Sequence, residues 1–264
     1  MLPETEPEQP TELNPYSAPD SASSLAAPPA PRPWGFWATA GLGVAVIGTF
    51  VLMQSVAFLV AWFVFPPDGV TMEQHANDGD VLGAMTLVSG TAALLLIALF
   101  AMLRGWNPAR YVGLQAPVGK RYVPAWIALT AGLGFVHSYF APMLGVESPP
   151  EFMIVAWTTT DSFALLILGV SLMAPLFEET FFRGFLFAGW AKSWMGVAGT
   201  AVLTSLLWTV IHIQYGWYEL SFILILGILL VVARHQTRSL WTPLLMHAVN
   251  NSIAMVGMAF EMGA

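Results

Sequence analysis

The chain has 264 residues, of which 56% are hydrophobic and only 9% are charged, and its formal net charge is −7. Soluble domains carry about 25% charged residues, so this composition, with a mean hydropathy of +0.67, indicates a chain that crosses a membrane several times. The absence of cysteine excludes disulfides, thiolate nucleophiles and cysteine zinc sites. The sequence has no cluster of basic residues of the kind that binds nucleic acid.

The N-terminal segment 1–32 is rich in Pro, Glu, Ser and Ala and has almost no large apolar side chain. Such a segment cannot bury enough apolar surface to offset the entropy cost of ordering it. We therefore predict a disordered, Pro- and acid-rich tail at 1–32 and a membrane domain at 33–264. The tail lacks the basic start and the early apolar run of a signal peptide.

Seven apolar runs follow the tail, and a run of about 20 apolar residues can cross a bilayer as a helix. The predicted fold class is all-α, a polytopic transmembrane helix bundle of about seven spans, or eight if one piece is re-entrant. Pro175 falls inside the fourth run, so a kink or two helical pieces are expected there. A short piece near 151–158 is expected at the interface. The runs lie at 34–64, 81–103, 122–145, 161–190, 195–215, 220–234 and 239–260.

The loops between these runs alternate in charge. Loops with basic residues predict the cytoplasmic side, which places the N-terminus in the cytoplasm and the C-terminus outside. The basic loop residues are Arg32, Arg104, Arg110, Lys120, Arg121, Lys192, Arg234 and Arg238. The acidic loop residues are Asp68, Glu73, Asp78, Asp80, Glu147, Glu151, Asp161 and Glu219.

The stretch FEETFFRG places Glu178, Glu179 and Arg183 inside the fourth apolar run. Charged groups at the centre of a span cost roughly 2.5–3.5 kcal/mol each, so they need partners or a function. Glu179 and Arg183 are four residues apart and share a helix face, where they can pair. Glu178 is rotated about 140° from Arg183 at 3.6 residues per turn. The spacing therefore nominates Glu178 as a free acid or base and Glu179 as structural, unless all three form one buried ion cluster.

Two further polar sets lie in later runs. His212 follows Trp208 by four residues, and taken alone it is typical of a histidine near the outer interface. His247 and Asn251 are also four apart, so an imidazole and an amide project from one helix face. That pair could stabilise an oxyanion, or it could form hydrogen bonds between helices. Asn250 points away and is expected to pack between helices.

These three sets resemble the motifs of the CAAX-protease and bacteriocin-processing (CPBP, Abi) family of membrane proteins. FEETFFRG is similar to the EExxxR motif, Trp208 to His212 is similar to FxxxH, and His247 to Asn251 is similar to HxxxN. The order and spacing agree over about residues 160–255, the protease-like core. Trp208 stands where the family motif has Phe, which keeps an aromatic side chain four residues before the histidine.

The resemblance implies an intramembrane endopeptidase of the glutamate type. Glu178 and His212 would activate a water, His247 and Asn251 would form the oxyanion hole, and Glu179 with Arg183 would hold the site together. A glutamate and two histidines could bind zinc, but the HExxH motif is absent, and no metal or other cofactor is expected. The site is expected to open towards the cytoplasmic half of the bilayer.

The expected location is the bacterial cytoplasmic membrane, and the expected partners are the lipid bilayer and a peptide or protein substrate in or at the membrane. The substrate and the oligomeric state cannot be read from the residues. A different class of function is a non-catalytic binding, immunity or scaffold protein that uses the same polar cluster for assembly. A proton-coupled transporter would also place Glu and His inside helices, but no inverted repeat supports it.

Overall fold

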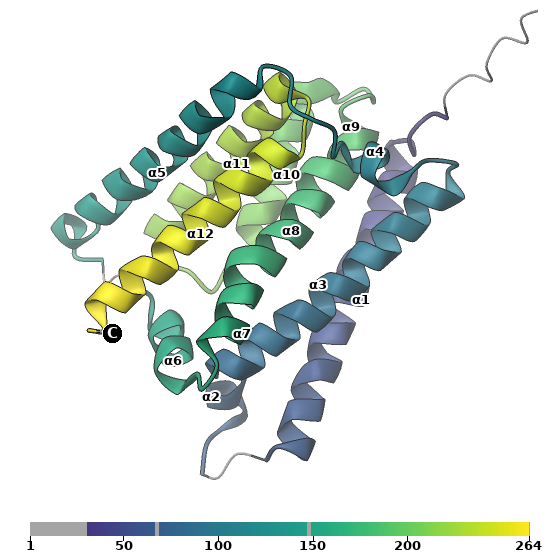
Figure 1. The fold of residues 1–264 in the computed structure, drawn as a ribbon. Coiled ribbons are helices and arrows are strands. Elements are labelled where there is room, and N and C mark those ends of the chain that lie inside the picture. The colour runs from purple at the N-terminus through teal and green to yellow at the C-terminus, as the bar shows by residue number, and fades with distance from the viewer. Residues whose placement is uncertain (1–30, 67–68, 147–148, 264) are drawn as a thin grey trace, which may run out of the picture. The chain divides into compact units, whose positions relative to one another are not determined.

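The computed structural model describes residues 31–66, 69–146 and 149–263, and every regular element among them is a helix (Figure 1). All seven predicted runs are helical, which confirms the all-α fold class. The predicted tail lies almost wholly in 1–30, outside the described residues, as do Asp68 and Glu147. The helices of the first three runs and their connections are α1 (Phe36–Val64), α2 (Met72–Ala76), α3 (Gly79–Leu103), α4 (Pro108–Val112), η1 (Lys120–Tyr122), α5 (Val123–Phe140) and η2 (Pro142–Leu144).

The remaining helices carry all the polar motifs. The short piece expected near 151–158 is helix α6 (Glu151–Thr159). The fourth run contains five consecutive helical segments, and the last three runs form one helix each. Their bounds are α7 (Phe163–Ile167), η3 (Leu168–Met173), α8 (Ala174–Glu178), η4 (Glu179–Leu186), α9 (Phe187–Trp190), α10 (Gly196–Val210), α11 (Trp217–Thr237) and α12 (Trp241–Glu261).

Among the described residues, five helical stretches are long and apolar enough to cross a bilayer. α10 has 15 residues and is therefore about 22 Å long, less than the roughly 30 Å of a hydrocarbon core. α12 has 21 residues but carries polar side chains in its middle, and it is not among the five. The five are Phe36–Val64, Gly79–Leu103, Lys120–Leu144, Phe163–Trp190 and Trp217–Thr237.

The outer surface of these helices is apolar, as a bilayer requires. On α1, for example, Val44 and Phe63 are each 74% exposed. Water would not favour such a face, whereas lipid chains cover it at no cost, and polar groups are buried inside instead. The protein is therefore an integral membrane protein.

The fourth run departs from a regular α-helix on both sides of Pro175. The segments η3 and η4 are π-helical, with hydrogen bonds from residue i to i+5, and they flank the α-helical turn that contains the proline. Proline has no N–H and its ring clashes with the carbonyl four residues earlier. The expectation of a kink or two helical pieces near Pro175 is met only in that the helix is irregular there: its pitch changes within one continuous stretch, Phe163–Trp190.

α3 and η3 cross at very short range, which fixes the fourth run against the bundle. A Cβ on Gly83 would lie 2.7 Å from the Leu165 carbonyl oxygen, and a Cβ on Gly169 would lie 2.9 Å from the Gly83 Cα. Only glycine permits these approaches. Elsewhere α1 packs on α3, α10 packs on α11, and α12 packs on both α5 and α11 (Figure 1).

Most of the described charges outside the cluster of Glu178, Glu179 and Arg183 lie at the two ends of the bundle. The basic end, as we name it, carries Arg104, Arg110, Lys120, Arg121, Lys192, Arg234 and Arg238, at the C-terminal ends of α3 and α11 and in the connections beside them. The acidic end carries Glu73, Asp78, Asp80, Glu151, Asp161 and Glu219, at or near α2, α6 and the N-terminal ends of α3 and α11.

Candidate active site

Glu179 and Arg183 form a fully buried ion pair, as their spacing predicted. Arg183 Nη1 donates to Glu179 Oε1 at 2.9 Å, and both side chains have 0% exposure. Arg183 Nη2 donates to the Gly227 carbonyl at 3.2 Å, and the guanidinium carbon lies 4.4 Å from the centre of the Trp208 ring. The pair is thus held by η4, α10 and α11 together.

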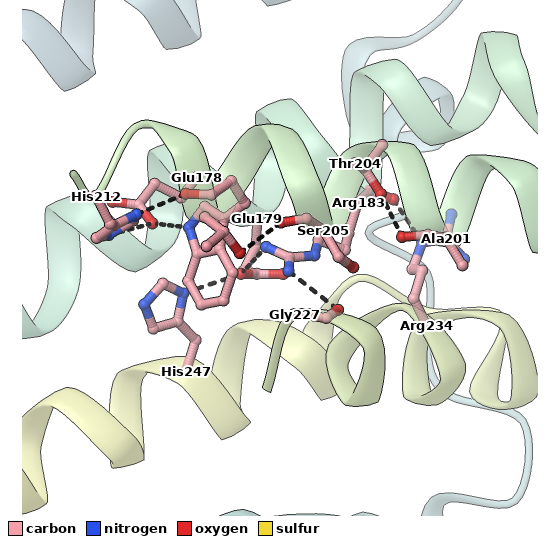
Figure 2. Close-up of polar contacts among 12 residues, drawn as sticks. Glu178, Glu179, Arg183, Ala201, Thr204, Ser205, His212, Gly227, Arg234 and His247 are labelled. Carbon is pink, nitrogen blue, oxygen red and sulfur yellow. Dashed lines mark hydrogen bonds and ion pairs between the residues drawn. The ribbon is translucent and has the colours of Figure 1, made fainter. Parts of the chain in front are cut away.

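His247 joins this pair from α12. Its Nδ1 lies 2.9 Å from Glu179 Oε1, the same oxygen that accepts from Arg183 (Figure 2). A carboxylate only accepts hydrogen bonds, so Nδ1 carries the proton and Nε2 is the nitrogen left for other contacts. This contact between residues 68 positions apart was not predicted from the sequence.

Glu178 faces a different set of groups, also as predicted. Its Oε2 accepts a hydrogen bond from the Trp208 indole at 2.5 Å and lies 4.0 Å from His212 Nε2. The Glu178 and His212 side chains are 14% and 17% exposed, whereas Glu179 is fully enclosed. The two adjacent glutamates therefore differ in both partners and access, although the 3.6-residue pitch used to separate them does not hold beyond Glu179.

His212 lies in the turn that follows α10, and its tautomer is set by a local bond. Its Nδ1 is 2.7 Å from the Trp208 carbonyl oxygen. A carbonyl can only accept, so Nδ1 is protonated and the neutral ring presents the Nε2 lone pair towards Glu178. α10 ends at Val210, and the turn that follows it holds His212 Nε2 4.0 Å from Glu178 Oε2.

Asn251 contacts the fourth run from α12. Its Nδ2 donates to the Val170 carbonyl at 2.9 Å, and its Oδ1 accepts from Asn250 Nδ2 at 3.3 Å. The Ala174 N–H bonds to Gly169 in the π turn, and residue 175 is a proline, so neither supplies a donor to Val170. Asn251 therefore satisfies a carbonyl that the helix itself leaves without a partner.

The four residues predicted to be catalytic line one cavity of about 190 Å³. Glu178, His212, His247 and Asn251 all contribute to its wall, while Glu179 and Arg183 lie behind it. The sequence analysis missed two polar members of the wall on α10 and α12. Trp208 was noted only as an aromatic substitution, and Asn250 was assigned to packing. The other lining residues are Leu82, Thr86, Phe152, Val170, Ala174, Phe222, Ile223 and Leu226.

The cavity lies in the half of the bundle nearer the acidic end. It takes Leu82 and Thr86 from the start of α3, Phe152 from α6 and Phe222 from the start of α11. The expectation that the site opens towards the half with basic loops is therefore wrong. The lining that places it there comes from α6 and from the starts of α3 and α11, which none of the three sequence motifs includes.

Tyr215 packs beside the site in the same turn as His212, with the two ring centres 6.0 Å apart. Burial raises the pKa of this phenol to about 12, and the carboxylates of Glu178 and Glu219 act in the same direction. Tyr215 is thus a neutral hydroxyl at physiological pH. Among the described residues, no group of three or more His, Asp or Glu side chains has the arrangement of a metal site.

Comparison with known proteins supports the motif resemblance over the part of the chain that carries the site. Residues 160–253 match the family model described as type II CAAX prenyl endopeptidase Rce1-like. A curated Escherichia coli protein described as an uncharacterized 24.3 kDa protein is 28% identical over 177 residues, which cover 63% of this chain and 77% of that protein. No solved structure matches. Residues 160–253 are thus similar to the Rce1-like family model, which confirms over this segment the resemblance to the CAAX-protease and bacteriocin-processing family that the three motifs indicated.

Proposed function

We propose that this protein is a membrane-embedded endopeptidase that hydrolyses a peptide bond with a water activated by Glu178 and His212. The family model that matches residues 160–253 describes endopeptidases, which supports a protease. The observation that carries the finer proposal is the convergence of Glu178, His212, His247 and Asn251 on one cavity from three separate helical regions.

The geometry between Glu178 and His212 suits a bound water. Glu178 Oε2 and His212 Nε2 are 4.0 Å apart. A water placed about 2.8 Å from each atom could donate one of its hydrogens to Glu178 and the other to His212. With Glu178 as a carboxylate and the His212 proton on Nδ1, both atoms are acceptors, so the water's lone pairs remain directed at a substrate carbonyl. In the attack, Glu178 takes one proton from the water and then delivers it to the leaving amine.

His247 and Asn251 are suited to stabilise the oxyanion that forms on the substrate. Because His247 Nδ1 donates to Glu179, its Nε2 donates to the oxyanion when the ring is an imidazolium. Asn251 uses one amide hydrogen on Val170, and its second remains for the substrate. Donors fixed in this way favour the transition state over the ground state.

Glu179 and Arg183 are positioning residues in this proposal. Arg183 neutralises Glu179 inside the bundle, and Glu179 in turn orients the His247 ring through the oxygen that all three groups share. Their role is to set the direction of His247 Nε2 without contacting the substrate. No metal is required by these steps, and cleavage is expected to survive prolonged incubation with a chelator.

The proposed substrate is a peptide or protein segment that reaches the cavity within the bilayer. The loop charges favour an N-terminus in the cytoplasm. The similarity to an Escherichia coli protein supports a bacterial cytoplasmic membrane. In that orientation the cavity faces the outer half of the bilayer, since its lining comes from the acidic end. Such a substrate would be bound beside Phe152 and Phe222, the two aromatic residues of the lining nearest that end.

The proposal is tested by comparing new protein termini in native membranes that contain the wild-type chain or Glu178→Ala at matched abundance. Fragments that disappear only with Glu178→Ala would identify both the activity and its substrates. A matched control is Glu73→Ala, which removes a carboxylate from the acidic end far from the cavity. Identical fragment patterns in all three membranes would refute the protease and favour a binding or scaffold role for the polar cluster.

A further inference from the structure

A second polar cavity lies at the basic end of the bundle, on the opposite side of Arg183 from the active site. It has a volume of about 180 Å³ and is bordered by α4, α9 and the last turn of α11. Three cations line it, Arg110, Lys192 and Arg234, together with the phenol of Tyr111, and no carboxylate among the described residues does so. Figure 2 shows Arg234 beyond Arg183, away from His212.

Arg234 is unusual because its charge is buried without a counter-ion. It is 9% exposed, and no Asp or Glu among the described residues lies within ion-pair distance of it. Nε donates to the Arg183 carbonyl at 3.1 Å and Nη2 donates to the Val112 carbonyl at 3.4 Å. Nη1 has no acceptor among the described residues. A buried cation in this state strongly favours an anion beside it.

The local backbone is built to hold this guanidinium in place. A Cβ on Gly113 would lie 2.1 Å from Arg234 Nη2, and Gly113 also has a φ of +87°, which glycine adopts without strain. Tyr111 is 4% exposed, and its hydroxyl oxygen accepts from the Trp34 N–H at 3.4 Å, so its proton remains to be donated. Burial raises the pKa of Tyr111, which keeps it a neutral donor.

We propose that this cavity binds the phosphate group of an anionic membrane lipid. The phosphate would sit between the fixed guanidinium of Arg234 and the exposed, adjustable side chains of Arg110 and Lys192. The cavity is at the end of the spanning helices, the depth at which lipid head groups lie, and its three cations exceed what one phosphodiester charge requires. Free phosphate shares this chemistry but lacks the acyl chains that would place it there.

The test measures lipid binding, so its outcome does not depend on the proposed protease activity. The purified full chain in detergent is titrated with phosphatidylglycerol or with phosphatidylcholine of the same acyl chains, and bound lipid is counted by native mass spectrometry. The variant Arg110→Gln/Lys192→Gln removes two exposed cations from the cavity. The control Lys120→Gln/Arg121→Gln removes two exposed cations from the same end of the bundle that do not line it.

We expect the wild type and the control to prefer phosphatidylglycerol, and the cavity variant to lose about tenfold in affinity, as lost charge-assisted contacts predict. Equal loss in both variants would mean general attraction to a basic surface and would overturn the proposal. Displacement of the lipid by inorganic phosphate at comparable concentration would assign the site to free phosphate instead.

The acidic N-terminal segment is the competing occupant within the chain. Replacing its five acids, Glu4, Glu6, Glu8, Glu12 and Asp20, by their amides tests it directly. If the wild type binds no phosphatidylglycerol but this variant does, then the segment and not a lipid supplies the anion, and the lipid proposal fails. Unchanged lipid binding in this variant supports the proposal.

Discussion

The substitution Glu178→Gln separates the chemical role of the first glutamate from its structural role. Glutamine has nearly the same shape, and its carbonyl oxygen can still accept the Trp208 indole hydrogen bond. It has no anionic oxygen to take a proton from water, and its amide cannot return one to a leaving amine. Glu178→Gln should therefore keep the fold and abolish cleavage.

The expected sizes follow from the contacts of Glu178. General acid–base catalysis contributes about 10²- to 10⁴-fold, so kcat should fall by at least about 10²-fold. A hydrogen bond to a charged acceptor stabilises by about 1.5–3 kcal/mol and one to a neutral acceptor by about 0.5–1.5 kcal/mol. The free energy of unfolding should therefore decrease by only about 1 kcal/mol. The decrease is smaller still if the neutral glutamine is less costly to bury than the charged glutamate, because that gain offsets the weaker hydrogen bond.

The assay uses a peptide spanning a cleavage site found in native membranes, with wild-type, Glu178→Gln and Glu178→Asp proteins in the same lipid. Thermal unfolding of each protein is measured in parallel. Glu178→Asp keeps the carboxylate but withdraws it from His212, so it should retain a small fraction of the activity. If Glu178→Gln, still folded, cleaves at more than about a tenth of the wild-type rate, then Glu178 is not the base.

Three further outcomes follow from the same geometry. Glu179→Gln should cost about 3–5 kcal/mol of unfolding free energy, because Arg183 is then buried without a counter-ion, and chemical denaturation that shows a loss below about 1 kcal/mol would contradict this. Asn251→Ala should lower kcat by about 10²- to 10³-fold with a smaller change in KM, and a change in KM alone would exclude an oxyanion role. Tyr215 has a folded pKa of about 12 against an ordinary value of 10.0, so its protonated form favours the folded state and stability should fall as pH rises from 10 to 12. Tyr215→Phe should remove that part of the decline, as measured by unfolding at each pH.

The contacts that are local in sequence were predictable from it. Glu179 and Arg183 lie four residues apart, and a pair at that spacing forms even though the intervening turn is π-helical. It was also predictable that Glu178 has different surroundings from Glu179, because neighbouring residues on any helix point in different directions. The seven helical runs were also predictable, since an apolar run of sufficient length has few alternatives to a helix in a membrane.

The contacts between helices were not predictable from spacing. Nothing in the sequence places His247 on Glu179 or the Trp208 indole on Glu178, because both depend on how α10 and α12 pack against the fourth run. The sequence did offer one signal for the Trp208 contact: Trp replaces the Phe of the family motif, and an indole has a hydrogen-bond donor that a phenyl ring lacks. The end of α10 at Val210, just before the turn that holds His212, carries no proline or other strong stop signal.

Pro175 links the irregular pitch of the fourth run to the site itself. The π turn before it takes the Ala174 N–H away from Val170, and the proline cannot replace that donor. The Val170 carbonyl therefore remains available in the middle of the bundle, where an unpaired carbonyl would be costly. Asn251 pairs with it across the helix interface, and that bond fixes the amide beside His247 on the cavity wall. The proline thus orients a polar side chain on α12, more than seventy residues later in the chain, and does so by withholding a hydrogen bond.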